Sequence, residues 1–294
     1  MPRIYDPIDH LLALDPGARG IAGFFIPGSA RRAAASLAEA RRVLLTTGFA
    51  LGPALPETDG PPGAVVLGRA LRALGKSVSY VSDQATVPLL EAALKVLREP
   101  VEVIAFPDGD SEELLARRLL TQTAPTHLVA VERPGRARDG DYWSARGESV
   151  RAWNRPVDSL FLVRSRRTMT IGIGDGGNEI GMGNVRARVA RQGALAKRIA
   201  SVVKVDHLVV AGTSNWGAYG VAAHLALLSG RPLLHAPEEE RRLIAACVEA
   251  GGVDGMTRRR EARVDGLPVD AHAAFVELLR TVIERPRTEG GKRT

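Results

Sequence analysis

The chain has 294 residues, 45% hydrophobic and only 4% aromatic, and its 40 lysines and arginines against 33 acids give a net charge of +7. The basic residues are scattered and no aromatic side chains alternate with them, so we predict no nucleic-acid partner. No stretch approaches the roughly 20 apolar residues of a membrane span, so we also predict no membrane partner. The single cysteine, Cys247, excludes an internal disulfide and fits a reducing compartment. Asp6, Asp9 and Asp15 argue against a secretory signal or transit peptide, so we expect a cytoplasmic location.

Short apolar runs alternate with helical patterns along the chain. In chain order, the predicted elements are a helix at Ser29–Arg41, a strand at Val43–Thr47, a helix at Pro62–Leu74, strands at Val78–Ser82 and Val101–Phe106, a helix at Asp110–Leu120, strands at His127–Val131, Thr168–Ile173 and His207–Ala211, a helix beginning near Ser214, a strand at Pro232–His235 and a helix at Pro237–Ala250. Asp110 and Glu113 have the spacing of a capping box, with Asp110 as the cap.

This alternation predicts an α/β fold, with a doubly wound, mostly parallel sheet and helices on both faces. The predicted single domain spans residues 1–283, with its core at about 43–268, and residues 284–294 are predicted to be a disordered tail. Arg133–Asn154 is the one long irregular stretch, and we expect a small, partly helical cap over the site there.

Polar, glycine-rich segments follow the predicted strands, where ligands bind in open α/β sheets. The candidate site residues in these segments are Thr47, Glu57 and Asp59 after the first strand, Glu132 and Arg133 after the fourth, Asp175, Asn178 and Glu179 after the fifth, and Ser214 and Asn215 after the sixth. We expect these segments to meet at one edge of the sheet. His127 and His207 begin strands at the opposite edge, and no two histidines have zinc-ligand spacing, so histidine-based chemistry is poorly supported.

Two glycine-rich motifs resemble known signatures but fail their requirements. Gly172, Gly174 and Gly177 satisfy G-x-G-x-x-G, yet Gly181 and Gly183 disfavour a helix directly afterwards, and Asp175 and Glu179 would repel a pyrophosphate. In Gly212–Gly217 the second glycine comes one residue too late for a nucleophile elbow, so we expect Ser214 to cap a helix or bind substrate.

Five carboxylates therefore remain as candidates for the chemistry: Glu57, Asp59, Glu132, Asp175 and Glu179. Each also has a structural interpretation, because Asp and Glu commonly cap helices, order turns and pair with neighbouring cations. Clustered carboxyl groups raise one another's pKa, so that one can act as an acid while another acts as a base. They also provide oxygen ligands for a hard cation, and the sequence leaves open a Mg, Ca or Mn cofactor while requiring none.

Several motifs together resemble the D-glutamate cyclase family, and more narrowly a stand-alone form of its C-terminal, cyclase-type domain. These motifs are Pro56–Ala64, Glu132–Tyr142 with Ala145–Gly147, Gly174–Gly183, Ser214–Gly217 and Val264–Pro268. The resemblance implies a hydro-lyase of D-amino acid metabolism that converts D-glutamate to 5-oxo-D-proline. Vertebrate members carry an additional N-terminal region and are mitochondrial, and the segment Met256–Arg263 is unusually basic here.

This interpretation assigns a role to each candidate residue. The predicted catalytic residues are Asp175, Glu179, Asn178, Asp59 and Glu57, and the predicted substrate-binding residues are Thr47, Glu132, Arg133, Arg146, Ser214 and Asn215. Arg133 and Arg146 would each anchor a carboxylate of a small acidic amino acid. Two alternatives remain: a ligand-binding protein without the chemistry, and a nucleotide-dependent enzyme. A homo-oligomer is also left open.

Overall fold

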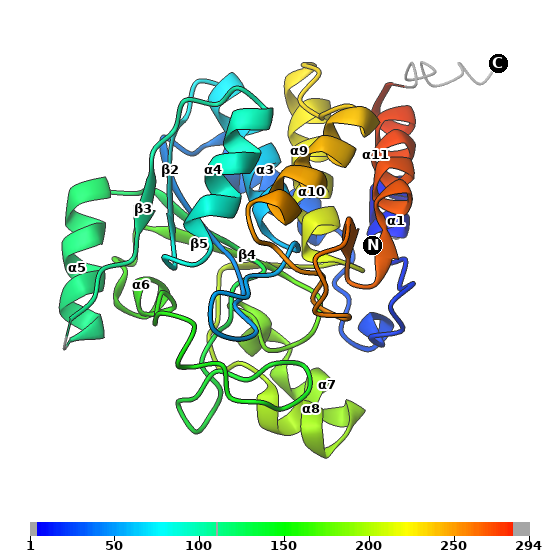
Figure 1. The fold of residues 1–294 in the computed structure, drawn as a ribbon. Helices are drawn as coiled ribbons and strands as arrows, with labels where there is room; N and C mark the ends of the chain where they lie inside the picture. The colour runs from blue at the N-terminus through cyan, green and yellow to red at the C-terminus, as the bar shows by residue number, and fades with distance from the viewer. Residues whose placement is uncertain (1–4, 110, 285–294) are drawn as a thin grey trace.

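The computed structural model describes residues 5–109 and 111–284. Six parallel strands form one sheet in the order β3-β2-β1-β4-β5-β6, which is the order of a Rossmann-type doubly wound sheet. Their bounds are β1 (Arg42–Thr47), β2 (Ser77–Ser82), β3 (Val103–Ala105), β4 (His127–Val131), β5 (Met169–Gly174) and β6 (His207–Val210). The predicted α/β fold class is therefore confirmed (Figure 1).

Helices cover both faces of the sheet (Figure 1). One layer contains α1 (Pro7–Leu12), α2 (Ser29–Ala38), α3 (Pro61–Ala73), α4 (Val87–Val96), α9 (Ser214–Ser229), α10 (Pro237–Glu249) and α11 (Val269–Glu284). The other contains α5 (Glu112–Thr123), α6 (Ser159–Val163), α7 (Arg186–Val189) and α8 (Ala194–Ile199), with the 3-10 helices η1 (Ile21–Gly23), η2 (Met182–Asn184) and η3 (Ala190–Gln192). A two-stranded hairpin, β7 (Arg263–Val264) and β8 (Leu267–Pro268), precedes α11.

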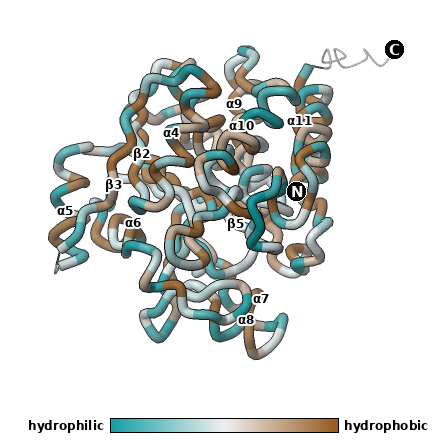
Figure 2. Tube along the Cα trace, viewed as in Figure 1, coloured by the Kyte–Doolittle hydropathy of each residue, from teal (hydrophilic) through white to brown (hydrophobic). Residues whose placement is uncertain are grey.

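Each central strand contributes to two hydrophobic cores because successive side chains point to opposite faces. In β4, Val129 and Val131 pack in the core below the α3 and α9 layer, whereas Leu128 and Ala130 pack in the core shared with α5 and α6. All five residues of β4 are buried, which explains why this strand reads as a continuous apolar run. Figure 2 shows hydrophobic residues along the strands and hydrophilic residues on outer loops and helix surfaces.

Several local predictions were wrong. Pro232–His235 is irregular rather than a strand, because β6 is the edge of the sheet and His235 is instead buried against Glu240 of α10. Thr213, not Ser214, caps α9 by accepting a hydrogen bond from the backbone N–H of Trp216 at 3.2 Å. Ser111 caps α5, and the predicted cap Asp110 lies outside the described residues.

The predicted cap over the site is present as a covering segment but has no helix. Residues 133–154 form turns and two isolated bridges, one joining Pro134 to Glu179 and one joining Trp143 to Ser149. Glu284, the first residue of the predicted disordered tail, is instead the last residue of α11, and the rest of that tail lies outside the described residues. Within residues 5–109 and 111–284, no helix combines the length and the apolar character needed to cross a membrane.

The strand order determines where a ligand can bind. After β1 the chain turns into the layer of α3, and after β4 it runs to α6 in the opposite layer. Because β1 and β4 are neighbours, their following loops separate and leave a crevice at the carboxyl end of the sheet. The loops after β5 and β6 end at the same edge, as the sequence predicted.

Candidate active site

A cavity of about 170 Å³ lies at this edge of the sheet. Its walls include three acidic side chains, three arginines and two other polar side chains: Glu57, Glu132, Asp265, Arg19, Arg146, Arg258, Ser144 and Asn178. Ligand pockets for drug-sized molecules are larger, about 300 Å³ or more, so this cavity suits a small molecule. The three buried acids favour a positively charged group of the ligand, such as an ammonium group, and the arginines favour its carboxylates.

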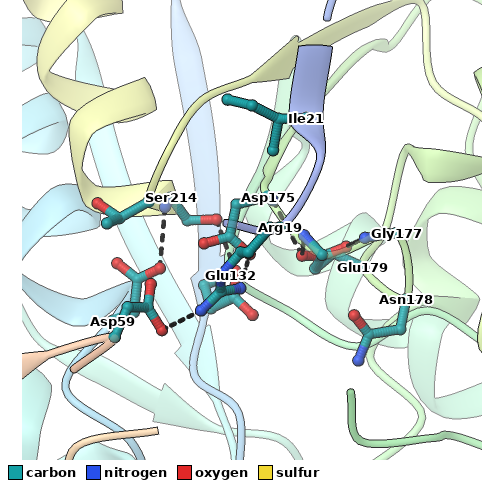
Figure 3. Close-up of polar contacts among 12 residues, drawn as sticks. Arg19, Ile21, Asp59, Glu132, Asp175, Gly177, Asn178, Glu179 and Ser214 are labelled. Carbon is teal, nitrogen blue, oxygen red and sulfur yellow. Dashed lines mark hydrogen bonds and ion pairs between the residues drawn. The ribbon is translucent and has the colours of Figure 1, made fainter. Parts of the chain in front are cut away.

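Arg19 is the centre of the charged groups in this site, and the sequence analysis did not identify it. Its Nη1 pairs with Asp175 Oδ1 at 2.5 Å (Figure 3), and its Nη2 pairs with Asp265 Oδ1. Asp15 holds the preceding turn by accepting backbone N–H groups of Arg19 and Gly20 at 2.8 and 2.7 Å. Arg19 thus joins the loop after β5 to the β7–β8 hairpin and remains on the cavity wall.

The glycine loop after β5 is closed by its own carboxylate. Glu179 accepts the backbone N–H groups of Asp175, Gly176 and Gly177 at 3.0, 2.5 and 2.7 Å (Figure 3). Gly177 has φ of +102°, a backbone conformation that favours glycine and allows this tight turn. In a phosphate-binding loop such N–H groups would face the phosphate, whereas here they bind Glu179. This arrangement gives Glu179 a structural position beneath Asp175.

A second set of acids lies at the N-terminus of α9. Asp59 accepts the backbone N–H groups of Ser214 and Asn215 at 2.8 and 2.9 Å, and Glu132 Oε2 accepts the Ser214 hydroxyl at 2.6 Å. The Asn215 amide oxygen accepts the N–H groups of Gly60 and Gly63 at 3.0 and 2.7 Å, where α3 begins. Ser214 and Asn215 are fully buried, so they support the acids from below rather than line the cavity.

Burial and crowding shift the protonation equilibria of the acids in this site. Burial, followed by the charges of Asp265 and Asp59, raises the pKa of Glu57 well above its ordinary value. Burial, followed by Glu179 and Glu57, raises the pKa of Glu132 in the same way. Burial also raises the pKa of Asp175, although the Arg19 charge opposes it. These carboxyl groups therefore retain protons at pH values where exposed acids are ionised, as proton transfer at neutral pH requires.

The remaining predicted residues lie at different depths. Arg133 is fully buried and is bound to Asp83, with Nη2 at 2.9 Å from Asp83 Oδ1, and it also donates to the carbonyls of Gly48 and Arg155. Thr47 is buried beneath the site at the end of β1. By contrast, Asn178 lines the cavity while its Nδ2 donates to the Trp143 carbonyl at 2.7 Å. Arg146 is exposed at the cavity and donates to the Met256 carbonyl at 2.5 Å.

Asp265 was not among the predicted site residues, although it lies within the motif Val264–Pro268 that carries part of the family resemblance. Asp265 is only 7% exposed, and its φ of +54° is unusual for a residue other than glycine. His272 of α11 contacts the carbonyl of Val264 at 3.2 Å and accepts from the Trp216 indole at 3.0 Å. These contacts hold the hairpin that carries Asp265 against α9.

Fold and site together define an α/β protein with a small ligand site, lined by acids and arginines, at the switch point of a Rossmann-type sheet. A family model described as the D-glutamate cyclase-like, C-terminal domain matches residues 8–280, and the chain belongs to this family. D-glutamate cyclase, mitochondrial, of Homo sapiens is 38% identical over 236 residues. That match covers 75% of this chain but 38% of the human protein, so the chain spans well under half of its relative's length.

Solved structures give weaker similarities. The manganese-bound exonuclease RecJ has a TM-score of 0.40 and 12% identity, covering 86% of this chain and 48% of that chain. An exopolyphosphatase-related protein from Bacteroides fragilis has a TM-score of 0.43 and 7% identity, covering 90% of this chain and 63% of that chain. Similarity at this level supports no inference about the function or the metal use of the present chain.

Proposed function

We propose that this chain catalyses the intramolecular dehydration of D-glutamate, or a close analogue, to 5-oxo-D-proline, as a carbon–oxygen lyase. The observation that carries the proposal is a small cavity in which Glu57 and Glu132, both with raised pKa, lie beside Arg19. This chemistry suits a substrate that has two carboxylates and one ammonium group. Membership of the D-glutamate cyclase-like family supports the same substrate.

The reaction itself requires two proton movements. The amine nitrogen attacks the carbon of the side-chain carboxyl group, a C–N bond forms, and one C–O bond breaks. The ammonium group loses two protons in becoming an amide N–H, and the departing oxygen gains two in becoming water, so no net proton is released. Catalysis therefore needs a group that accepts a proton from nitrogen and a group that gives one to oxygen. Glu57 and Glu132, on the cavity wall, are the two groups we assign to these transfers.

The other side chains on the cavity wall position the substrate in this proposal. Arg19 and Arg146 bind the substrate carboxylates, because guanidinium groups donate several hydrogen bonds in a fixed plane. Asn178 uses its remaining N–H to stabilise the negative charge that develops on the attacked carboxyl group. Both Nη atoms of Arg133 are bound by Asp83 and by backbone carbonyls, so we assign Arg133 to holding the loops after β2 and β4 together.

The decisive experiment is to incubate the purified protein with D-glutamate and L-glutamate separately and to follow 5-oxoproline by chiral chromatography. We expect 5-oxo-D-proline to form from D-glutamate well above the spontaneous rate. Saturable binding of glutamate without turnover would contradict the proposal and favour a binding protein. A rise in melting temperature with nucleotides but not with amino acids would favour the nucleotide alternative. The cytoplasmic location stays a prediction, and the human relative is named as mitochondrial.

A further inference from the structure

Three buried aspartates from distant parts of the chain meet beside the cavity. Asp59 follows β1, Asp175 follows β5, and Asp265 lies between β7 and β8. One carboxylate oxygen of each lies within 4.8 Å of those of the other two. Their residues are 2%, 0% and 7% exposed, so water can reach little of their charge. Three carboxylates this close cannot all stay ionised in a buried site unless positive charge balances them.

Arg19 balances only part of this charge, because it uses one oxygen of each aspartate it contacts. Its two Nη atoms face Asp175 Oδ1 and Asp265 Oδ1. Asp175 Oδ2 and Asp265 Oδ2 are buried, and within the part of the chain that the structure describes neither has a hydrogen-bond partner. Buried carboxylate oxygens are rarely left unsatisfied, and each still has lone pairs to offer. Two unpartnered oxygens thus belong to the same group of three aspartates.

We propose that Asp59, Asp175 and Asp265 bind a hard divalent cation. All three donors are carboxylate oxygens, which Mg²⁺, Mn²⁺ and Ca²⁺ prefer, and none is the sulfur or nitrogen typical of zinc. Because one oxygen of each aspartate lies within 4.8 Å of the other two, all three can reach a common ion, whose bonds to oxygen are about 2.0–2.6 Å long. Arg19 would keep its contacts with the two Oδ1 atoms and hold both side chains in place for the ion.

The role of this ion rests on the proposed function. Asp265 lines the same cavity as Glu57 and Glu132, so a cation held by Asp265 would lie beside the bound substrate. There it would polarise the side-chain carboxyl group as a Lewis acid and favour the loss of its oxygen. Asp175 and Asp265 each offer a buried oxygen without a hydrogen-bond partner, and Asp59 would bind the ion through a second lone pair, since each of its oxygens accepts one backbone N–H. Glu179 is not a ligand in this proposal, because its two oxygens already accept three backbone N–H groups that close the glycine loop. This distinction separates the proposal from a general attraction of cations to acidic loops.

The test is a titration of chelator-treated full-length protein with Mn²⁺, followed by electron paramagnetic resonance of free Mn²⁺ and by calorimetry. We expect one Mn²⁺ per chain and at least tenfold weaker binding in Asp265→Asn and in Asp175→Asn. Asp270→Asn, a change to an exposed aspartate of α11, is the matched control and should bind as the wild type does. Circular dichroism and melting temperature establish that each variant is folded. If Asp175→Asn does not fold, Asp265→Asn alone decides the result.

Failure of this inference and failure of the proposed function give different results. No Mn²⁺ binding by the wild type up to millimolar concentration, or equal binding by wild type and Asp265→Asn, would overturn the cation site. If such a protein still forms 5-oxo-D-proline in chelator, the proposed function stands without the ion. Stoichiometric Mn²⁺ binding that depends on Asp265, with no turnover of D-glutamate or L-glutamate, would instead support the site and reject the substrate.

Discussion

Replacing Glu57 by Gln should lower the catalytic activity and raise the free energy of unfolding. Because the two quantities should change in opposite directions, the variant tests proton transfer directly. The Glu57 side chain is 6% exposed and lies on the cavity wall. Its burial and its acidic neighbours Asp265 and Asp59 raise its pKa well above the ordinary value of 4.5. Gln keeps the size and polarity of Glu, but it cannot exchange a proton at neutral pH. A structural role would make the substitution destabilising, whereas a catalytic role would not.

The sign and size of the stability change follow from the raised pKa. A carboxyl group whose pKa is higher in the folded protein than in the unfolded protein stabilises the fold at low pH. That stabilisation is lost as the pH rises toward the folded pKa. Gln has no such pH dependence. The free energy of unfolding of Glu57→Gln should therefore increase relative to wild type by about 1.4 kcal/mol per pH unit. The increase begins near the ordinary pKa of 4.5 and stops at the raised pKa.

Urea denaturation at several pH values between 5 and 8, in chelator, measures this difference directly. In parallel, kcat/KM for D-glutamate should fall by on the order of a hundredfold or more, as for loss of a general acid or base. Glu277→Gln, on the exposed surface of α11, should match the wild type in both measurements. Wild-type kcat/KM in Glu57→Gln would refute the proton-transfer role. A stability difference that is constant with pH would refute the raised pKa.

Three further substitutions test the support beneath the site. Arg133→Leu should lower the free energy of unfolding by about 3–5 kcal/mol, because it leaves the Asp83 carboxylate buried without its charged partner, and an unchanged urea midpoint would contradict this. Asn215→Ala should lower the free energy of unfolding by about 1–3 kcal/mol, because two N–H groups at the start of α3 lose their acceptor. An unchanged free energy of unfolding would show that water replaces the Asn215 oxygen. Glu179→Ala should lower the melting temperature, and formate should partly restore it by occupying the same N–H groups; no rescue would mean that the loop rearranges.

The candidate acids were predictable because they directly follow buried strands of a parallel sheet. Glu132 and Asp175 lie within two residues of the ends of β4 and β5, and the carboxyl ends of parallel strands share one edge. Their separation in space is therefore nearly determined by the strand order. The order itself is not visible in the alternation of elements, because any arrangement of six parallel strands would give the same alternation.

Arg19 and Asp265 could not be placed by the same reasoning, since neither follows a strand of the main sheet. Arg19 precedes β1 and reaches the site only because Asp15 folds its turn. Asp265 lies in a short hairpin held by His272 and α9. For Arg133, the sequence predicted the location but not the partner. Its pairing with Asp83, which follows β2, depends on how the loops cross above the sheet. Side-chain partners between loops follow from tertiary packing, which periodicity does not encode.

The combination of a Rossmann strand order and a glycine-rich loop ordinarily indicates a phosphate ligand. Here, carboxylates of the chain itself accept the backbone N–H groups that would bind a phosphate. Glu179 occupies the N–H groups of the glycine loop, and Asp59 occupies the N–H groups at the start of α9. Both are places where a phosphate oxygen would bind in a nucleotide-binding protein. With those donors satisfied, the cavity is lined by the more exposed Arg146 and Arg258 and, where it is buried, by three carboxyl groups around Arg19. A polyanionic nucleotide would meet repulsion there, whereas an ammonium group or a divalent cation would relieve it, because each adds the positive charge that the crowded acids lack.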